Sequence, residues 1–295
     1  MAEFVAEVSS NHHGSLERCE RFIETAKDIG CDSVKFQLFR IEELFSPEIL
    51  AKSERHRQRK AWELPLEFIP GLAAKCRDLD IKFSCTPFYL AAVDQLRPYA
   101  DFLKVASYEL LWTDLIRSCG ATGLPVVLST GMATMPEIER AVDALLAAGS
   151  KDMTLLHCVS GYPVPADQCN LSAIGTMRNE LSKKHPDARI KFGWSDHSVN
   201  PGVIYRAINH WGAGMVEFHL DLDGTGDEYK TGHCWLPGEI GEVIRNVKRG
   251  ILFQGDERAD GKGKKEPVGQ EMIEREWRAD PEDGLRPLKK TRKTF

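Results

Sequence analysis

Short apolar and β-branched runs alternate with amphipathic stretches along most of this chain, and this alternation constrains the fold more than any other feature. Eight runs are predicted to be strands, at residues 4–8, 33–37, 81–85, 102–106, 125–129, 153–158, 189–193 and 215–219. Helical patterns such as SLERCERFIETAKDIG lie between them, most of them closed by a glycine or an aspartate turn. Strand then helix, eight times over about 250 residues, predicts a (β/α)8 TIM barrel of the α/β class.

A doubly wound parallel sheet is the alternative fold. Such a sheet usually carries a glycine-rich phosphate loop after its first strand, and both GxGxxG and GxxxxGK are absent here. The barrel is therefore favoured. A longer, basic and helical insertion, residues 41–64, follows the second predicted strand and is expected to cover one mouth of the barrel.

The composition changes after about residue 255. We expect a barrel over residues 1–254 and a short charged C-terminal tail over residues 255–295. A disordered, solubilising tail is one interpretation of its glycine and charge content. Trp277 and Leu285 argue instead for a tail that is partly ordered or contacts a partner.

Charge and cysteine usage exclude several classes of function. The net charge of -5 and the pI near 6.0 disfavour a nucleic-acid partner. The eight cysteines are scattered singly, as expected of reduced thiols in a cytoplasmic protein. The sequence has no secretory signal pattern and no eighteen-residue apolar stretch, so we expect no membrane segment.

Polar residues gather at the predicted strand ends, where a barrel of this kind places its chemistry. Lys35 and Lys104 lie inside apolar runs, and a buried ammonium group needs a counter-charge. A structural salt bridge to a neighbouring carboxylate would supply one. Two such lysines beside several hydroxyl groups favour a bound phosphate or carboxylate.

Two histidines end the last two predicted strands, His197 in WSDHSVN and His219 in VEFHLDLDG. Neighbouring strands lie about 5 Å apart, so the two imidazoles could share one metal ion. Two nitrogen ligands completed by oxygen suit a harder ion than zinc, and histidine favours Mn²⁺ over Mg²⁺. Two separately satisfied histidines remain the alternative.

At this point the motifs resemble those of the N-acetylneuraminate (sialic acid) synthase family. The likeness covers residues 1–250 and rests on AEVSSNHHGSLERC, VKFQ, FSCTPF, LKVASYE, LSTGM, LLHCVSGYPVP, GWSDHS and VEFHLDLD, in the family's order. Members condense phosphoenolpyruvate with an unphosphorylated aldose, typically N-acetylmannosamine, and release phosphate. The resemblance therefore implies a C–C bond-forming transferase whose partners are phosphoenolpyruvate and an amino sugar.

The resemblance also assigns roles to residues. It implies that His197 and His219 bind the divalent metal, usually Mn²⁺, with Mg²⁺ and Co²⁺ as alternatives. The positions that hold phosphoenolpyruvate match Lys35, Thr86, Lys104, Ser107, Ser160 and Ser195. Tyr162 matches a tyrosine near the acceptor sugar, and Asp227, with Glu228, approximates an acidic residue that binds sugar hydroxyls.

The catalytic proton needs a carboxylate. Glu7 is the first candidate for handling the proton of the attacking water and Glu109 the second, with Gln37 beside the donor-binding residues. Both carboxylates could equally pair with the two lysines. Mutation of Glu7 without loss of turnover would remove it from the list.

The sequence departs from the family at two places. The segment TGDEYKTGHCWLP replaces the family's usual pattern, so the acceptor pocket is expected to be remodelled. The chain is also too short for the antifreeze-like domain that most bacterial members carry, and which lends an arginine to the partner subunit of a homodimer. We expect a homodimer here, in which Arg275, Arg278 or Arg286 could substitute for that arginine.

Other functions stay open. A lysine-dependent Schiff-base aldolase would explain a desolvated lysine but not the paired histidines. A catalytically inactive barrel that binds a sugar acid is a second alternative. A synthase for phosphorylated acceptors is the third, with the basic run of residues 55–60 as its phosphate site.

Overall fold

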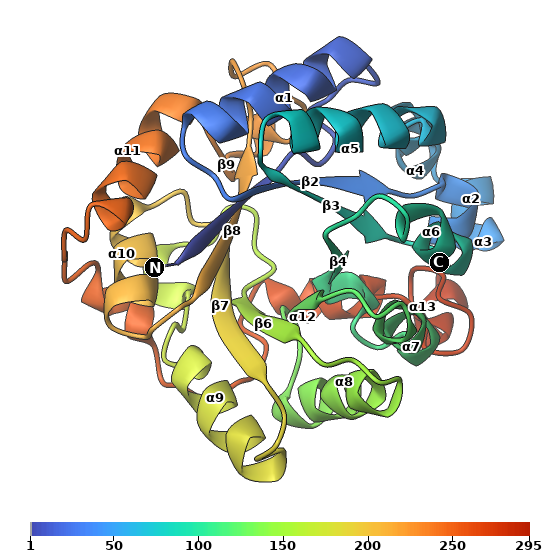
Figure 1. Cartoon of the computed structure of the whole chain (residues 1–295). Coiled ribbons are helices and arrows are strands. Elements are labelled where there is room, and N and C mark those ends of the chain that lie inside the picture. Colours follow the sequence, from blue (N-terminus) through green and yellow to red (C-terminus); the bar gives the residue numbers. More distant parts are fainter. Residues whose placement is uncertain (1) are drawn as a thin grey trace.

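The computed structural model describes residues 2–295 and shows a closed barrel of eight parallel strands surrounded by helices (Figure 1). The strands are β1 (Glu3–Glu7), β2 (Ser33–Leu38), β3 (Lys82–Pro87), β4 (Phe102–Val105), β5 (Val126–Ser129), β6 (Met153–Cys158), β7 (Ile190–Asp196) and β8 (Met215–Leu220). Each strand pairs with the next, and β1 pairs with β8 so that Glu7 lies opposite His219. The predicted (β/α)8 barrel is confirmed.

Eight helices cover the outside of the barrel (Figure 1). They are α1 (Leu16–Asp28), α5 (Ile69–Asp78), α6 (Leu90–Leu96), α7 (Thr113–Ala121), α8 (Met135–Ala147), α9 (Ala173–Lys184), α10 (Pro201–Asn209) and α11 (Pro237–Lys248). Local sequence sets their starts. The Ser15 hydroxyl accepts from the Arg18 amide at the start of α1, and Thr134 and Glu137 form a capping box on α8.

The barrel interior changes from apolar to charged along the strands. Because alternate residues of a strand face the same side, Val5 and Glu7 share the interior side of β1, and Met215, Glu217 and His219 share that of β8. The apolar layer is buried and consists of Val5, Phe102, Val127, Leu156 and Met215. The charged residues therefore lie next to this apolar layer, on the side of the carboxyl ends of the strands.

The insertion after β2 folds into short helices at the same mouth. These are α2 (Ile41–Leu44), α3 (Pro47–Lys52), α4 (Glu54–Gln58) and the 3-10 turns η1 (Arg59–Trp62) and η2 (Leu66–Phe68). Further 3-10 turns, η3 (Ser107–Glu109) and η4 (Ala166–Gln168), follow β4 and β6. After β8 the chain forms η5 (Tyr229–Thr231) and a two-residue strand, β9 (Cys234–Trp235), which pairs with β8.

The C-terminal tail packs on the barrel. It contains η6 (Glu257–Asp260), α12 (Glu271–Glu274), η7 (Arg275–Trp277) and α13 (Lys289–Arg292), coloured orange to red in Figure 1. Its Ala259 carbonyl accepts from the Leu171 amide at 2.7 Å, and its Arg286 amide donates to the Leu44 carbonyl at 2.8 Å. The tail thus runs from the loop after β6 to the insertion after β2.

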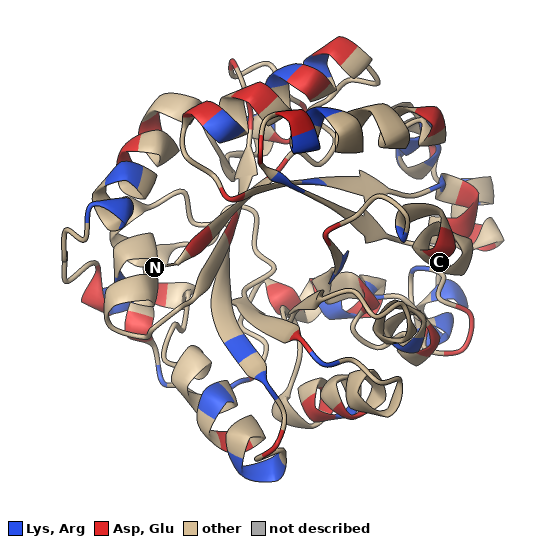
Figure 2. Cartoon of the chain, viewed as in Figure 1, with Lys and Arg blue, Asp and Glu red and all other residues tan. Residues whose placement is uncertain are grey.

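Charged residues of both signs are spread over the outer helices (Figure 2). All eight cysteines are buried and free. Within residues 2–295, none of the helices combines the length and the apolar character that crossing a bilayer requires.

Candidate functional site

Five of the predicted site residues form one buried network at the carboxyl ends of the strands. Lys35 forms an ion pair with Glu7 and donates to the Thr86 hydroxyl at 3.1 Å. The Gln37 amide donates to Glu7 at 2.9 Å. Lys104 reaches this network through Glu217, which lies 3.1 Å from Lys104 and 3.9 Å from Lys35. Glu217 thus lies close to both lysines, and Glu7 is the nearer carboxylate of Lys35.

The two lysines differ in their electrostatic surroundings. Burial lowers the pKa of each ammonium group, but Glu217 and Glu7 together raise the pKa of Lys35 above its usual value. Lys104 faces one close carboxylate and the like charge of Lys35, so burial leaves its pKa below the usual value. Burial opposes ionisation of Glu217 as well, yet Lys104 and Lys35 lower its pKa to about 2. An added anion would therefore stabilise the charged form of Lys104 more than that of Lys35.

Two predicted serines meet over a glycine. Ser107 accepts a hydrogen bond from the Gly131 amide at 3.0 Å. A Cβ atom on Gly131 would lie 2.8 Å from the Ser107 hydroxyl and 2.3 Å from the Ser160 hydroxyl. The buried Ser160 hydroxyl has no hydrogen-bond partner among residues 2–295. This cradle of two hydroxyls and bare backbone fits an oxygen-rich anion such as phosphate.

Ser195 lies between the cradle and the lysine network. It is buried in β7, opposite Cys158 of β6 on one side and Glu217 of β8 on the other. The predicted donor-binding residues therefore all lie at the carboxyl ends of the strands or in the turns that follow.

The predicted metal ligands converge. The ring centroids of His197 and His219 are 5.3 Å apart. His197 Nδ1 lies 2.8 Å from the Val159 carbonyl, which can only accept, so Nδ1 carries a proton and Nε2 is the ring nitrogen left to face a metal ion. This is the usual orientation of a metal-binding imidazole.

The loop after β8 adds two donors that the sequence argument did not assign to a metal. His219, Glu228, His233 and Cys234 each offer a donor atom within 4.8 Å of the others. Glu228 lies 2.9 Å from His219 Nδ1 and 3.6 Å from His233 Nε2. Nitrogen and carboxylate donors at these spacings suit a divalent transition metal, so the residues present fit the ion that the resemblance implies.

The acceptor-side residues take different positions. The Tyr162 ring lies 4.4 Å from that of His197 and 4.9 Å from that of His233. Asp227 lies at the rim, where it accepts from the Trp62 indole at 3.2 Å and from Lys230 at 2.9 Å. Its neighbour Glu228 is the acidic residue of this loop that points at the histidines.

Glu109 is held by the tail. Arg286 donates to its carboxylate at 2.8 Å through Nε, and both side chains are buried. Burial raises the pKa of Glu109, and Arg286 lowers it by less. The Arg286 guanidinium also stacks over the Tyr108 ring at 4.3 Å. Glu7, by contrast, is paired with Lys35 and accepts hydrogen bonds from Gln37 and Ser9.

A second tail residue supports the cradle. Glu271 accepts from the amides of Met132 and Ser160 at 2.6 and 2.8 Å, which joins the loops after β5 and β6. The other two tail arginines, Arg275 and Arg278, bind Glu137 at the start of α8. Nothing in the sequence pattern indicated these contacts.

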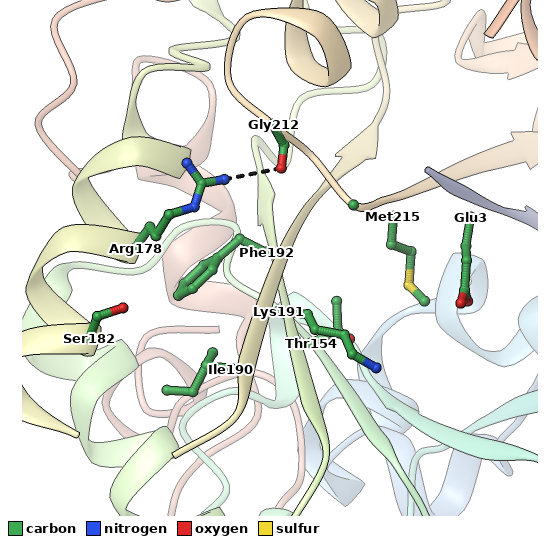
Figure 3. Close-up of a pocket in the computed structure, with 10 residues that line it drawn as sticks. Glu3, Thr154, Arg178, Ser182, Ile190, Lys191, Phe192, Gly212 and Met215 are labelled. Atoms are coloured by element: carbon green, nitrogen blue, oxygen red, sulfur yellow. Dashed lines mark hydrogen bonds between the residues drawn. The ribbon is translucent and has the colours of Figure 1, made fainter. Parts of the chain in front are cut away.

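Two surface hollows lie at the other end of the barrel. One of about 520 Å³ is lined by residues at the strand starts, including Thr154, Lys191 and Met215, with Arg178 bonded to the Gly212 carbonyl (Figure 3). These hollows are distinct from the mouth that carries the buried charges. The chemistry of the residues, not the size of a cavity, therefore locates the site.

The model of the NeuB family matches residues 22–259. The chain belongs to the NeuB family. An uncharacterised protein from Methanocaldococcus jannaschii is 32% identical to this chain, and the match covers 83% of this chain and 69% of that protein.

Two further NeuB relatives have named activities. The N,N'-diacetyllegionaminic acid synthase of Campylobacter jejuni is 31% identical over 85% of this chain and 77% of its own length. The structure of an N-acetylneuraminic acid synthetase from Leptospira borgpetersenii has a TM-score of 0.75 at 28% identity, and the match covers 92% of this chain and 90% of that one. NeuB synthases are metal-dependent enzymes that form C–C bonds with phosphoenolpyruvate, and this chain is an enzyme of that kind.

Proposed function

We propose that this NeuB-family enzyme condenses phosphoenolpyruvate with an unphosphorylated N-acetyl amino sugar similar to N-acetylmannosamine. The products are a sialic-acid-type 2-keto sugar acid and phosphate. One observation carries the proposal. Two buried lysines, the hydroxyl cradle at Gly131 and a histidine cluster occupy one mouth of the barrel.

The donor site follows from the charges. Lys35 and Lys104 would neutralise the anionic groups of phosphoenolpyruvate, with Thr86, Ser107, Ser160 and Ser195 donating hydrogen bonds. In the ligand-free arrangement Glu7 and Glu217 already balance the two lysines. A bound trianion therefore loosens these ion pairs, which frees Glu7 to accept a proton.

The reaction then needs two bond-forming steps. C3 of phosphoenolpyruvate attacks the aldehyde carbon, water adds to the cation left at C2, and the tetrahedral intermediate loses phosphate. Glu7, held by the Gln37 amide at 2.9 Å and the Ser9 amide at 3.0 Å, takes the proton of the water. A divalent ion, which we propose to be Mn²⁺, would supply Lewis acidity toward the aldehyde oxygen when bound at His197 and His219.

The acceptor side is formed by Tyr162, Asp227 and the loop after β8. Tyr162 is partly exposed over the histidines, where a sugar ring could pack against it. We propose further that the enzyme works in the cytoplasm as a homodimer. The intramolecular ion pair of Arg286 with Glu109 supports a role of that arginine within its own subunit.

A phosphorylated acceptor is the second candidate, and one observation favours it. Arg59, in the insertion, packs between the rings of Phe45 and Trp62 at 5.5 and 5.4 Å. Its Nε is buried and has no hydrogen-bond partner among residues 2–295. Burial first, and then the charges of Arg286 and Arg55, lower its pKa, so an anionic group here would be stabilised.

The test is phosphate release from phosphoenolpyruvate after chelation and addition of Mn²⁺. We expect release with an unphosphorylated N-acetyl hexosamine and loss of release in Lys104→Met. Release with 6-phosphorylated sugars alone would favour the second candidate. If none of the aldoses supported phosphate release, although the protein bound phosphoenolpyruvate and metal, both acceptor proposals would be contradicted.

A further inference from the structure

We propose that Glu228 and His233, from the loop after β8, bind the divalent ion together with His197 and His219. The chain would then hold its metal through three imidazoles and one carboxylate. This inference rests on the proposed function for the presence of an ion at the site. It goes beyond that function in the ligand set and in the class of ion selected.

The spacing of the donors is that of ligands sharing one ion. Two atoms each about 2.1 Å from a metal lie about 3 to 3.5 Å from one another when they occupy neighbouring positions. Glu228 Oε2 is 2.9 Å from His219 Nδ1 and 3.6 Å from His233 Nε2. The His233 ring is 4.6 Å from that of His219 and 6.0 Å from that of His197. The donor atoms of His219, Glu228 and His233 therefore lie around one volume, and the His197 ring borders it.

Each new ligand is fixed by a second contact. His233 Nδ1 lies 2.6 Å from the Thr231 hydroxyl, which leaves Nε2 to face Glu228. The other oxygen of Glu228 accepts from the Ser9 hydroxyl at 2.5 Å. Metal-binding imidazoles and carboxylates are commonly oriented by such partners. Three of the four donors are buried or nearly so, and Glu228 is partly exposed.

The loop that carries these residues is tightly fixed to the barrel. The Glu228 amide donates to the Asn11 side chain at 3.1 Å, and the Gly226 amide donates to Asp221 at 3.2 Å. A Cβ atom at Gly226 would lie 2.3 Å from Asn11 Oδ1, so the backbone approaches too closely for a side chain. The two donors are thus held near the strand ends rather than on a free loop.

Cys234 completes the four-residue group but faces another partner. Its sulfur accepts from the Asn11 side-chain amide at 3.6 Å. Because this contact directs the sulfur toward Asn11, we leave Cys234 out of the ligand set.

The ligand set predicts the ion. Three imidazole nitrogens favour transition metals such as Mn²⁺, Co²⁺ and Zn²⁺ over Mg²⁺, which prefers oxygen and water. A six-coordinate ion with four protein donors keeps two positions for substrate oxygens. Asp227, at the rim, is then left for the acceptor.

The test is metal binding by the full-length, chelator-stripped protein without substrates. Mn²⁺ affinity is measured by calorimetry, and the visible spectrum of bound Co²⁺ reports the ligand field. We expect His233→Asn and Glu228→Gln each to weaken Mn²⁺ binding at least about tenfold and to alter the Co²⁺ spectrum. His210→Asn, at an exposed histidine that ends α10, is the matched control and should change neither.

Selectivity gives a second measurement that misfolding does not mimic. His233→Asn should narrow the preference for Mn²⁺ over Mg²⁺, because it removes nitrogen but keeps the carboxylate. Unchanged affinity and spectrum in both variants, with binding lost in His219→Asn, would overturn the inference and leave the proposed function intact. Metal binding that depends on His233, without phosphate release from any aldose, would instead contradict the proposed function alone.

Discussion

At the scale of single residues, Lys35 and Lys104 show how this barrel compensates buried cations with buried carboxylates. Each lies in a strand run whose apolar neighbours would suit a core, and each is only 2% exposed. Glu217 bonds one and lies near the other, so removal of this one carboxylate affects two buried cations. The sequence predicted anionic partners for the lysines but could not show that the protein itself supplies them.

Replacement of Glu217 should therefore be costly. We expect Glu217→Gln to lower the free energy of unfolding by about 3 to 5 kcal/mol, because a buried charge loses its partner. The double variant Lys104→Met/Glu217→Leu removes both charges and should lose less. Urea denaturation measures both, and a loss in Glu217→Gln smaller than that of the double variant would refute the shared counter-charge.

The Gly131 cradle gives a second prediction at this scale. Gly131→Ala places a methyl group between the Ser107 and Ser160 hydroxyls, so phosphoenolpyruvate binding should weaken about tenfold or more while metal binding is kept. Gly71→Ala, in α5 where a Cβ meets nothing within 4 Å, is the control. It should bind normally and be slightly more stable. Calorimetry with phosphoenolpyruvate distinguishes the two.

At the scale of elements, the tail is the segment whose structure the sequence described least. Its glycine and charge content is compatible with disorder, yet Ala259 and Ala279 are fully buried and Glu271 is only 1% exposed. Its contacts join the loops after β4, β5 and β6 and the insertion after β2. Long-range pairings of this kind leave no periodic pattern in a sequence.

Glu271 should affect binding of phosphoenolpyruvate indirectly, through the loops after β5 and β6 that it joins. We expect Glu271→Ala to raise the KM for phosphoenolpyruvate about tenfold with a smaller change in kcat, because two amides beside the cradle lose their acceptor. Glu271→Gln keeps an acceptor oxygen and should be milder. Met272→Ala, at the exposed neighbour, is the control. Equal kinetics in Glu271→Ala and Met272→Ala would remove Glu271 from the positioning residues.

Docking of the tail should depend on pH. Burial opposes ionisation of Glu137, but the Thr134 amide, Arg278 and Arg275 together lower its pKa below the usual 4.5. A depressed pKa stabilises the docked tail above pH 4.5, and this contribution is lost as the pH falls through the lower, folded value. Cleavage of the tail by a protease that is active from pH 3 to 7, normalised to cleavage of an unstructured peptide, should therefore rise as the pH drops below 4.5. In Glu137→Gln the tail should already be loose at pH 7, with a flatter pH profile.

At the scale of the whole molecule, the barrel was predictable because each strand is a short apolar and β-branched run that can be recognised from its own residues. The predicted run at residues 153–158 coincides with β6, and the others differ from the observed strands by a few residues at their ends. Strand order predicted that His197 and His219 could meet, and the family resemblance favoured this over two separately satisfied histidines. Glu228 and His233 could not be placed in this way, since the turn before β9 sets their directions.

Metal removal should destabilise the entire barrel. An ion present at a hundred times its Kd stabilises the folded state by about 2.7 kcal/mol. For a domain of this size that corresponds to a Tm shift of about 5 °C or more. A chelator should thus lower the Tm of the wild-type protein and leave that of His219→Asn unchanged. An equal decrease in both would place the stabilising ion elsewhere.

The path of the tail also sets an order of assembly during translation. The eight barrel strands, both lysines and the histidines proposed to bind the metal precede residue 240, whereas Glu271 and Arg286 are synthesised afterwards. A ribosome-bound chain can therefore close its barrel while the loops after β4, β5 and β6 still lack their tail partners. Such a nascent chain would hold the metal before it bound the phosphorylated donor well, so donor-binding competence would mark synthesis of the tail.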